Sequence, residues 1–249
     1  MRVLYQVPAP MSKGPMGRAE MERRQALLNS WAFPGTEVEV RDTAEGPFSI
    51  ESAWEEALSA PAALAAVRQA EEDGFDAVII GCFGDPGLEA ARELVGIPVI
   101  GPGESSLLLA AGLGHRFSVV TIEDNLVAPQ EVQAYKAGVR RKLASVVPTG
   151  VPVLSLLEDR EASTRRVIEA GRRAVERDGA DTLVLGCLTM SFLDVAETVS
   201  AAIGVPVVNA AKAALKAAEL QVSIGLSHSK KAYPVPPKLR GAGRPVETR

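Results

Sequence analysis

The sequence is poor in the side chains on which most metalloproteins and cofactor enzymes depend. Its 249 residues include two histidines, two cysteines and 4% aromatic residues. The two histidines and the two distant cysteines show no metal-ligand spacing, and no segment indicates a Schiff-base lysine among phosphate-binding elements. We therefore expect neither a metal nor a cofactor, and we interpret His115 and His228 as ordinary loop or helix-end residues.

Long apolar runs and excess positive charge are also lacking. No run of about 18 apolar residues suggests a membrane span, and the opening MRVLYQVPAP does not resemble a signal peptide. The net charge of −4 argues against a nucleic-acid partner. We expect a cytoplasmic protein with a small-molecule substrate, no membrane and no nucleic acid, in which a disulfide is disfavoured.

Short β-rich runs alternate with helical patterns along the chain, which is typical of an α/β fold with parallel strands. The first half predicts strands at 2–7, 37–41, 77–81 and 98–100, and helices at 18–30, 62–73, 85–94 and 104–113. The second half predicts strands at 117–122, 151–156, 182–186 and 206–208, and helices at 128–145, 162–178, 191–203 and 210–220.

The two halves form an internal repeat that places the two cysteines in equivalent positions. DGFDAVIIGC, which ends at Cys82, aligns without a gap with DGADTLVLGC, which ends at Cys187. Further on, GIPVIGPGESSLLLAAGLG aligns with GVPVVNAAKAALKAAELQV. We expect two pseudo-symmetric lobes, each a four-stranded parallel sheet flanked by helices, with an active site in the cleft between them. Each cysteine follows its lobe's third strand, at the sheet edge where ligands bind in open α/β folds.

Both thiols precede a predicted helix. Asp85 and Pro86 are suited to begin a helix after Cys82, and Thr189 or Ser191 can cap the helix after Cys187. A helix N-terminus lowers a thiol's pKa, so we expect two reactive thiols that alkylate readily. A thiolate on one side and a thiol on the other could invert a stereocentre without a cofactor. A lone buried cysteine would more often be a small hydrophobic residue, but two in mirrored positions favour chemistry.

Several segments resemble the aspartate/glutamate/hydantoin racemase superfamily, and within it the hydantoin and allantoin racemases. The matching segments span most of the chain and are GPFSIESAWEEALSAPAAL, CFGDPGLEAARE, IPVIGPGESS, RFSVVT, LGCLTM and LSHSKKAYPVPP. The resemblance implies cofactor-independent racemisation through Cys82 and Cys187. It also implies that the last strand and helix return to the first lobe, which gives lobe one as 1–102 plus about 208–228 and lobe two as 103–207. A homo-oligomer is plausible by the same resemblance.

The resemblance also implies a set of substrate-binding residues. Substrate carbonyls would be held by the backbone around Phe83, Gly84, Leu188 and Thr189. The other candidates are polar residues from neighbouring elements: Gln6, Ser49, Glu104, Ser105 and Thr121. Glu104 could equally be a first-turn residue favoured by the helix dipole, and Thr121 could only pack or cap a turn. Ser49 is the weakest candidate of the set.

Two segments depart from the pattern of the hydantoin and allantoin racemases. That branch typically opens with an Asn-Pro-Asn turn, where this chain reads QVPAPMSKGPMGRAEMERR from Gln6. An asparagine of that turn helps to bind the substrate, and the side-chain amide of Gln6 could take its place. The second motif is usually Cys-Ala-Gly-Met, whereas here Leu188 and Thr189 follow Cys187 and would reshape the pocket beside the thiol.

The sequence favours a racemase of a 5-substituted hydantoin or a related ureide such as allantoin. A racemase of free aspartate or glutamate and a cis–trans isomerase remain open, and so does a non-catalytic binding protein on the same fold. Decarboxylases resembling this family keep one catalytic cysteine, so two argue against that reaction. The basic, proline-containing segment 229–249 is interpreted as a poorly ordered or partner-packed tail, with a PxxP ligand as a weaker alternative.

Overall fold

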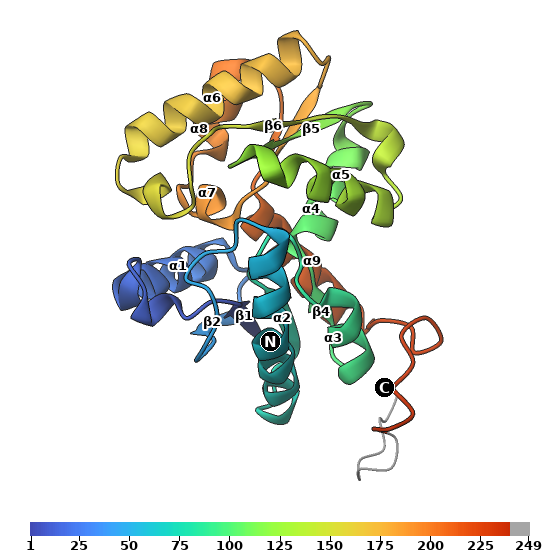
Figure 1. The fold of residues 1–249 in the computed structure, drawn as a ribbon. Helices are drawn as coiled ribbons and strands as arrows, with labels where there is room; N and C mark the ends of the chain where they lie inside the picture. Colours follow the sequence, from blue (N-terminus) through green and yellow to red (C-terminus); the bar gives the residue numbers. More distant parts are fainter. Residues whose placement is uncertain (240–249) are drawn as a thin grey trace.

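The computed structural model describes residues 1–239 and shows two lobes, each built on a four-stranded parallel sheet (Figure 1). The strand orders are β2-β1-β3-β4 and β6-β5-β7-β8, so the two sheets have the same topology. The first sheet contains β1 (Arg2–Val7), β2 (Glu37–Asp42), β3 (Ala77–Ile80) and β4 (Val99–Ile100). The second contains β5 (Phe117–Thr121), β6 (Leu143–Pro148), β7 (Thr182–Leu185) and β8 (Val207–Val208). The predicted α/β fold with two similar lobes is confirmed.

Helices cover both faces of the two sheets. In the first half they are η1 (Met11–Lys13), α1 (Gly17–Trp31), α2 (Ala53–Glu72), α3 (Leu88–Leu94) and α4 (Pro102–Leu113). In the second half they are η2 (Asp124–Leu126), α5 (Val127–Lys136), η3 (Arg140–Lys142), η4 (Leu154–Leu157), α6 (Arg160–Glu176), α7 (Leu188–Phe192), α8 (Ala196–Ile203) and α9 (Ala210–Ser223). Within residues 1–239, no helix combines the length and hydropathy needed to cross a bilayer.

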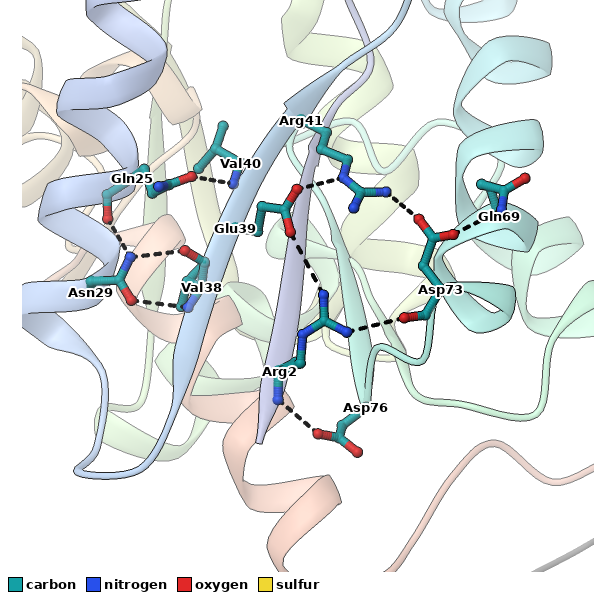
Figure 2. Close-up of polar contacts among 10 residues, drawn as sticks. All are labelled: Arg2, Gln25, Asn29, Val38, Glu39, Val40, Arg41, Gln69, Asp73 and Asp76. Carbon is teal, nitrogen blue, oxygen red and sulfur yellow. Dashed lines mark hydrogen bonds and ion pairs between the residues drawn. The ribbon is translucent and has the colours of Figure 1, made fainter.

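The exposed edge of the first sheet is covered by polar side chains of α1. The Asn29 amide bonds both the N–H and the carbonyl of Val38, at 2.9 and 2.8 Å, and Gln25 accepts from the Val40 N–H at 2.8 Å (Figure 2). An uncovered edge strand would offer these groups to another chain. These hydrogen bonds therefore hinder the pairing of β2 with a further strand.

The prediction was wrong between α5 and η4. The strand predicted at 151–156 is formed instead by the preceding run, Leu143–Pro148, and 154–157 is a 3-10 turn. The predicted helix 128–145 already ends at Lys136, because Gly138 takes a left-handed conformation with φ of 75°. The earlier run is the one that pairs with β5, as the edge strand of the second sheet.

The helix predicted at 191–203 is two helices, α7 and α8, and two other helices begin elsewhere than predicted. The helix predicted at 62–73 begins at Ala53, where the Ser52 side chain accepts from the Glu55 N–H and Pro61 lies inside the helix. The helix predicted from Asp85 begins at Leu88, after Gly87 in the left-handed region. Asp85 itself has a φ of 55°, and its carboxylate accepts hydrogen bonds from the first turn of another helix, α4.

The helices α4 and α9 lie between the two lobes and pack against each other (Figure 1). Helix α4 follows the last strand of the first sheet but contacts β7 and β8 of the second. Helix α9 follows the last strand of the second sheet but contacts β3 and β4 of the first. These contacts support the proposed division into 1–102 plus about 208–228 and 103–207. The last strand does not return with α9, because β8 pairs with β7 in the second sheet.

The start of the C-terminal segment is bound to the first lobe, which the sequence did not predict. Lys230 donates to the carbonyls of Arg92 and Val95, at 2.6 and 2.5 Å, and His228 Nε2 accepts from the Val99 N–H at 2.9 Å. Burial lowers the pKa of His228 to about 4, so the neutral ring remains an acceptor at neutral pH. Residues 240–249 of the predicted tail lie outside the described residues.

Candidate active site

A cavity of about 880 Å³ lies between the lobes, and both cysteines line it. Cys82 follows β3 and Cys187 follows β7, each two residues after its strand ends. Both strands occupy the third place in sheets of identical order, so the carboxyl ends of equivalent strands deliver the two thiols to one cleft.

The backbone holds the two sulfur atoms differently. Cys187 is the N-cap residue of α7, and the N–H groups of Thr189 and Met190 in the first turn favour its thiolate without forming a cap hydrogen bond to it. Cys82 precedes an irregular turn in which one N–H group, that of Gly84, favours its thiolate. The helix predicted directly after Cys82 is therefore absent there, and the expected symmetry of two helix N-termini does not hold.

The sequence-based prediction of lowered thiol pKa values was wrong. Burial raises the pKa of both thiols, and it outweighs the backbone N–H groups that favour the thiolate. The Cys82 sulfur also faces the carboxylates of Glu56 and Asp85, which raise its pKa further, whereas Arg24 lowers that of Cys187. At neutral pH both side chains are therefore mainly thiols.

The raised pKa values of the two thiols change the alkylation behaviour that we expect. Because both pKa values lie above the ordinary value of 9, we expect iodoacetamide labelling at pH 7 to be slow and to rise about tenfold per pH unit up to pH 9. Mass-spectrometric mapping over a pH series measures both rates, with free cysteine as the reference thiol. A rate independent of pH above 7 would contradict the raised values.

Asp85 links the Cys82 turn to α4 instead of capping the helix that follows it. Its carboxylate accepts from the N–H groups of Gly103 and Glu104, at 2.9 and 2.7 Å, and from Gln133 Nε2 at 2.9 Å. Gln133 Nε2 also donates to the carbonyl of Phe83 at 2.6 Å. Burial raises the pKa of Asp85 to about 7. The turn after Cys82 is thus fixed by groups of both α4 and α5.

Most of the predicted site residues reach the cavity. Besides the two cysteines, those that line it are Ser49, Phe83, Gly84, Glu104, Leu188 and Thr189. Glu104 forms an ion pair with the buried Arg92, which lines the same end of the cavity. Glu104 therefore presents a neutralised carboxylate and not a free anion.

Three predicted residues do not line the cavity. The Gln6 side chain is buried and donates to the carbonyl of Val7 at 3.0 Å, so its amide does not replace a substrate-binding asparagine. Ser105 donates to the Gly101 carbonyl at 2.8 Å within the first turn of α4. Thr121 is buried and accepts from Gln130 Nε2 at 2.8 Å, which matches the packing alternative.

Comparisons with known proteins agree with this arrangement. The family model for Asp/Glu/hydantoin racemase matches residues 18–218. A hydantoin racemase of Rhizobium meliloti is 37% identical over 94% of both chains, and one of Pseudomonas sp. (strain NS671) is 39% identical over 80% of this chain and 79% of its own. The crystal structure of an allantoin racemase from Pseudomonas fluorescens superposes with a TM-score of 0.88 at 33% identity, covering 95% of this chain and 97% of the other.

The chain belongs to the Asp/Glu/hydantoin racemase family. It is accordingly an isomerase of the racemase type, as the mirrored thiols suggested. The family resemblance drawn from the sequence is confirmed.

Sequence reasoning missed a buried charged group that lines the cavity. Arg24 of α1 is 2% exposed, lines the cavity and forms an ion pair with Glu20 at 2.8 Å. Glu20, Arg24 and Leu28 are buried at a spacing of four residues, so two charged residues lie on the inward stripe of a helix. That spacing could have indicated a site, because charged residues on the buried face of a helix usually have a partner or a function.

The cavity is also lined by acidic and apolar side chains. Glu56 of α2 lines the cavity near Gly84, and burial raises the pKa of its carboxyl. Phe48, Ile50 and Val132 form an apolar part of the wall. The cavity is therefore unsymmetrical in charge although its two thiols occupy equivalent positions.

Proposed function

We propose that this racemase inverts the C5 stereocentre of a 5-substituted hydantoin or a related ureide, with Cys82 and Cys187 as the two acid/base groups. The observation that carries the proposal is the pair of thiols at equivalent positions of two lobes, both lining one cavity. The names of the relatives, hydantoin racemase and allantoin racemase, support this substrate class.

The chemistry uses the acidity of C5–H beside a ring carbonyl. One sulfur, as thiolate, removes the C5 proton and becomes a thiol, while negative charge moves onto the carbonyl oxygen. The opposite thiol then delivers its proton to the other face of C5 and becomes the thiolate. The two groups exchange roles for the other enantiomer. Atoms and charge balance within the substrate and the two side chains, so the proposed reaction consumes no cofactor.

Backbone N–H groups beside the thiols support the charge that develops on oxygen. We place the substrate carbonyls at the backbone of Phe83 and Gly84 on one side and of Leu188 and Thr189 on the other. Fixed N–H donors stabilise an enolate more strongly than a neutral carbonyl. The apolar side chains of Phe48, Ile50 and Val132 also line the cavity and can contact the bound ring.

Proton NMR in D2O tests the reaction and its substrate together. The panel contains both enantiomers of benzyl- and isopropylhydantoin, allantoin, aspartate, glutamate and maleate. We expect loss of the C5–H signal of a hydantoin or ureide together with loss of optical rotation, at a rate above that of the enzyme-free sample. Exchange confined to free amino acids, or conversion of maleate, would replace this proposal by the corresponding reaction. Binding without exchange would indicate a non-catalytic member of the fold.

Substrate should also protect both thiols from the alkylation described above. Protection of one thiol alone would contradict the placement of the substrate between the two thiols.

A cytoplasmic location and a homo-oligomeric state remain predictions from the sequence.

A further inference from the structure

Arg24 is buried at the cleft with part of its hydrogen-bonding capacity unused. Its Nε donates to Glu20 at 2.8 Å, and its Nη2 donates to Thr189 Oγ1 at 3.0 Å and contacts Met16 Sδ at 3.6 Å. The guanidinium also lies over the Phe192 ring, 4.7 Å from the centroid. Among the described residues, the Nη1 nitrogen has no hydrogen-bond partner. Two N–H groups of a side chain that is 2% exposed and lines the cavity are therefore available to a ligand.

Thr189 adds a third available donor beside them. Its Oγ1 accepts from Arg24, and within residues 1–239 its own hydroxyl proton has no acceptor. The side chain is 4% exposed and lines the cavity. Because a hydroxyl can accept and donate at once, Thr189 both orients the guanidinium and offers a proton to the same ligand.

The local charge balance indicates an anionic ligand. Glu20 is shared between Arg24 and Arg23, whose Nε donates to Glu20 Oε2 at 2.7 Å, so two guanidinium groups face one carboxylate. The neighbouring Cys187 does not supply the missing negative charge at neutral pH, because burial raises its pKa. A buried positive charge without a full counter-charge is costly, and an arriving anion would remove that cost.

We propose that Arg24 and Thr189 form a carboxylate-binding subsite, so that the substrate is a hydantoin or ureide whose C5 side chain carries a carboxylate. The inference rests on the proposed function for the identity of the ring, while the anion subsite stands on its own geometry. A carboxylate fits here because its two oxygens can take the Nη1 donors of the planar guanidinium and the Thr189 hydroxyl together.

The test compares two probes that differ only in charge: 5-carboxymethylhydantoin and its neutral isostere 5-carbamoylmethylhydantoin. Their dissociation constants are measured by titration calorimetry, and their kcat/KM values by polarimetry, with the full-length chain. We expect the wild type to prefer the acid about 10- to 100-fold, and R24Q to lose that preference. R24K should keep part of it, and T189V should reduce it about 3- to 10-fold.

Each outcome decides between an anion subsite and a structural clamp between α1 and α7. An equal loss for both probes in R24Q, or no preference in the wild type, would overturn the subsite. If thermal denaturation shows that R24Q is not folded, the test uses R24K and T189V, with the same ratio of affinities for the acid and the neutral probe. If the wild type binds the acid preferentially but racemises neither probe, the proposed reaction fails and the subsite stands. If it binds neither probe, the subsite fails as well.

Discussion

Replacing either cysteine by serine is expected to lower racemisation in both directions by about 10³-fold or more. Each direction needs one sulfur to remove the C5 proton and the other to return one to the opposite face. A serine hydroxyl is a far weaker acid than a thiol and cannot form the required base at neutral pH. Cys82→Ser and Cys187→Ser should therefore each abolish inversion, measured by polarimetry from either pure enantiomer.

The same variants separate a two-thiol mechanism from a single-base mechanism. In D2O, Cys82→Ser should still exchange the C5 proton of the enantiomer whose C5–H faces Cys187, and Cys187→Ser should exchange that of the other enantiomer. The double variant should exchange neither. Circular dichroism and thermal unfolding confirm that each variant is folded. Unchanged inversion in either single variant would rule out the proposed mechanism.

The second large effect is expected at Gly103 in the first turn of α4. A Cβ atom there would lie 2.0 Å from Gln133 Nε2 and 2.1 Å from the carbonyl oxygen of Phe83. The carbonyl belongs to the backbone directly after Cys82, so Gly103→Ala must displace the turn that places this thiol. We expect a loss of about 3 kcal/mol in the free energy of unfolding. We also expect kcat/KM to fall about 100-fold or more, measured by polarimetry.

Gly112, in the same helix, provides the matched control. A Cβ at Gly112 would meet nothing within 4 Å, and alanine stabilises a helix by up to about 1 kcal/mol relative to glycine. Gly112→Ala should therefore unfold at the same or a higher temperature and keep full activity. Equal behaviour of the two variants would show that the close approach of α4 to the Cys82 turn does not position the thiol.

The repeat made the fold and the two thiols predictable from the sequence. DGFDAVIIGC and DGADTLVLGC report both the third strand of each sheet and the residue at its carboxyl end, and β3 and β7 lie there. Such segments are informative because a buried parallel strand needs a short, continuous apolar run. The error at β6 arose because two apolar runs, one on either side of Pro148-Thr149-Gly150, could each have been the strand.

The long-range contacts of the site were not predictable in the same way. Asp85 carries the local signature of a helix N-cap, yet its carboxylate accepts from Gly103 and Glu104, which belong to a later helix. Likewise, a helix N-terminus beside Cys187 favours the thiolate, but burial in the hydrophobic core of the second lobe outweighs this effect. A local sequence pattern does not reveal such hydrogen bonds or such burial, because both depend on which distant elements come together.

The crossing of α4 and α9 has a consequence for how this protein folds. Each helix belongs to one repeat by sequence and covers the sheet of the other repeat. Dividing the chain between the two repeats would remove a covering helix from both sheets at once, so neither half of the sequence contains a complete core of its own. We therefore expect the two halves to fold and unfold together, and the cleft between the lobes to form only in the complete chain.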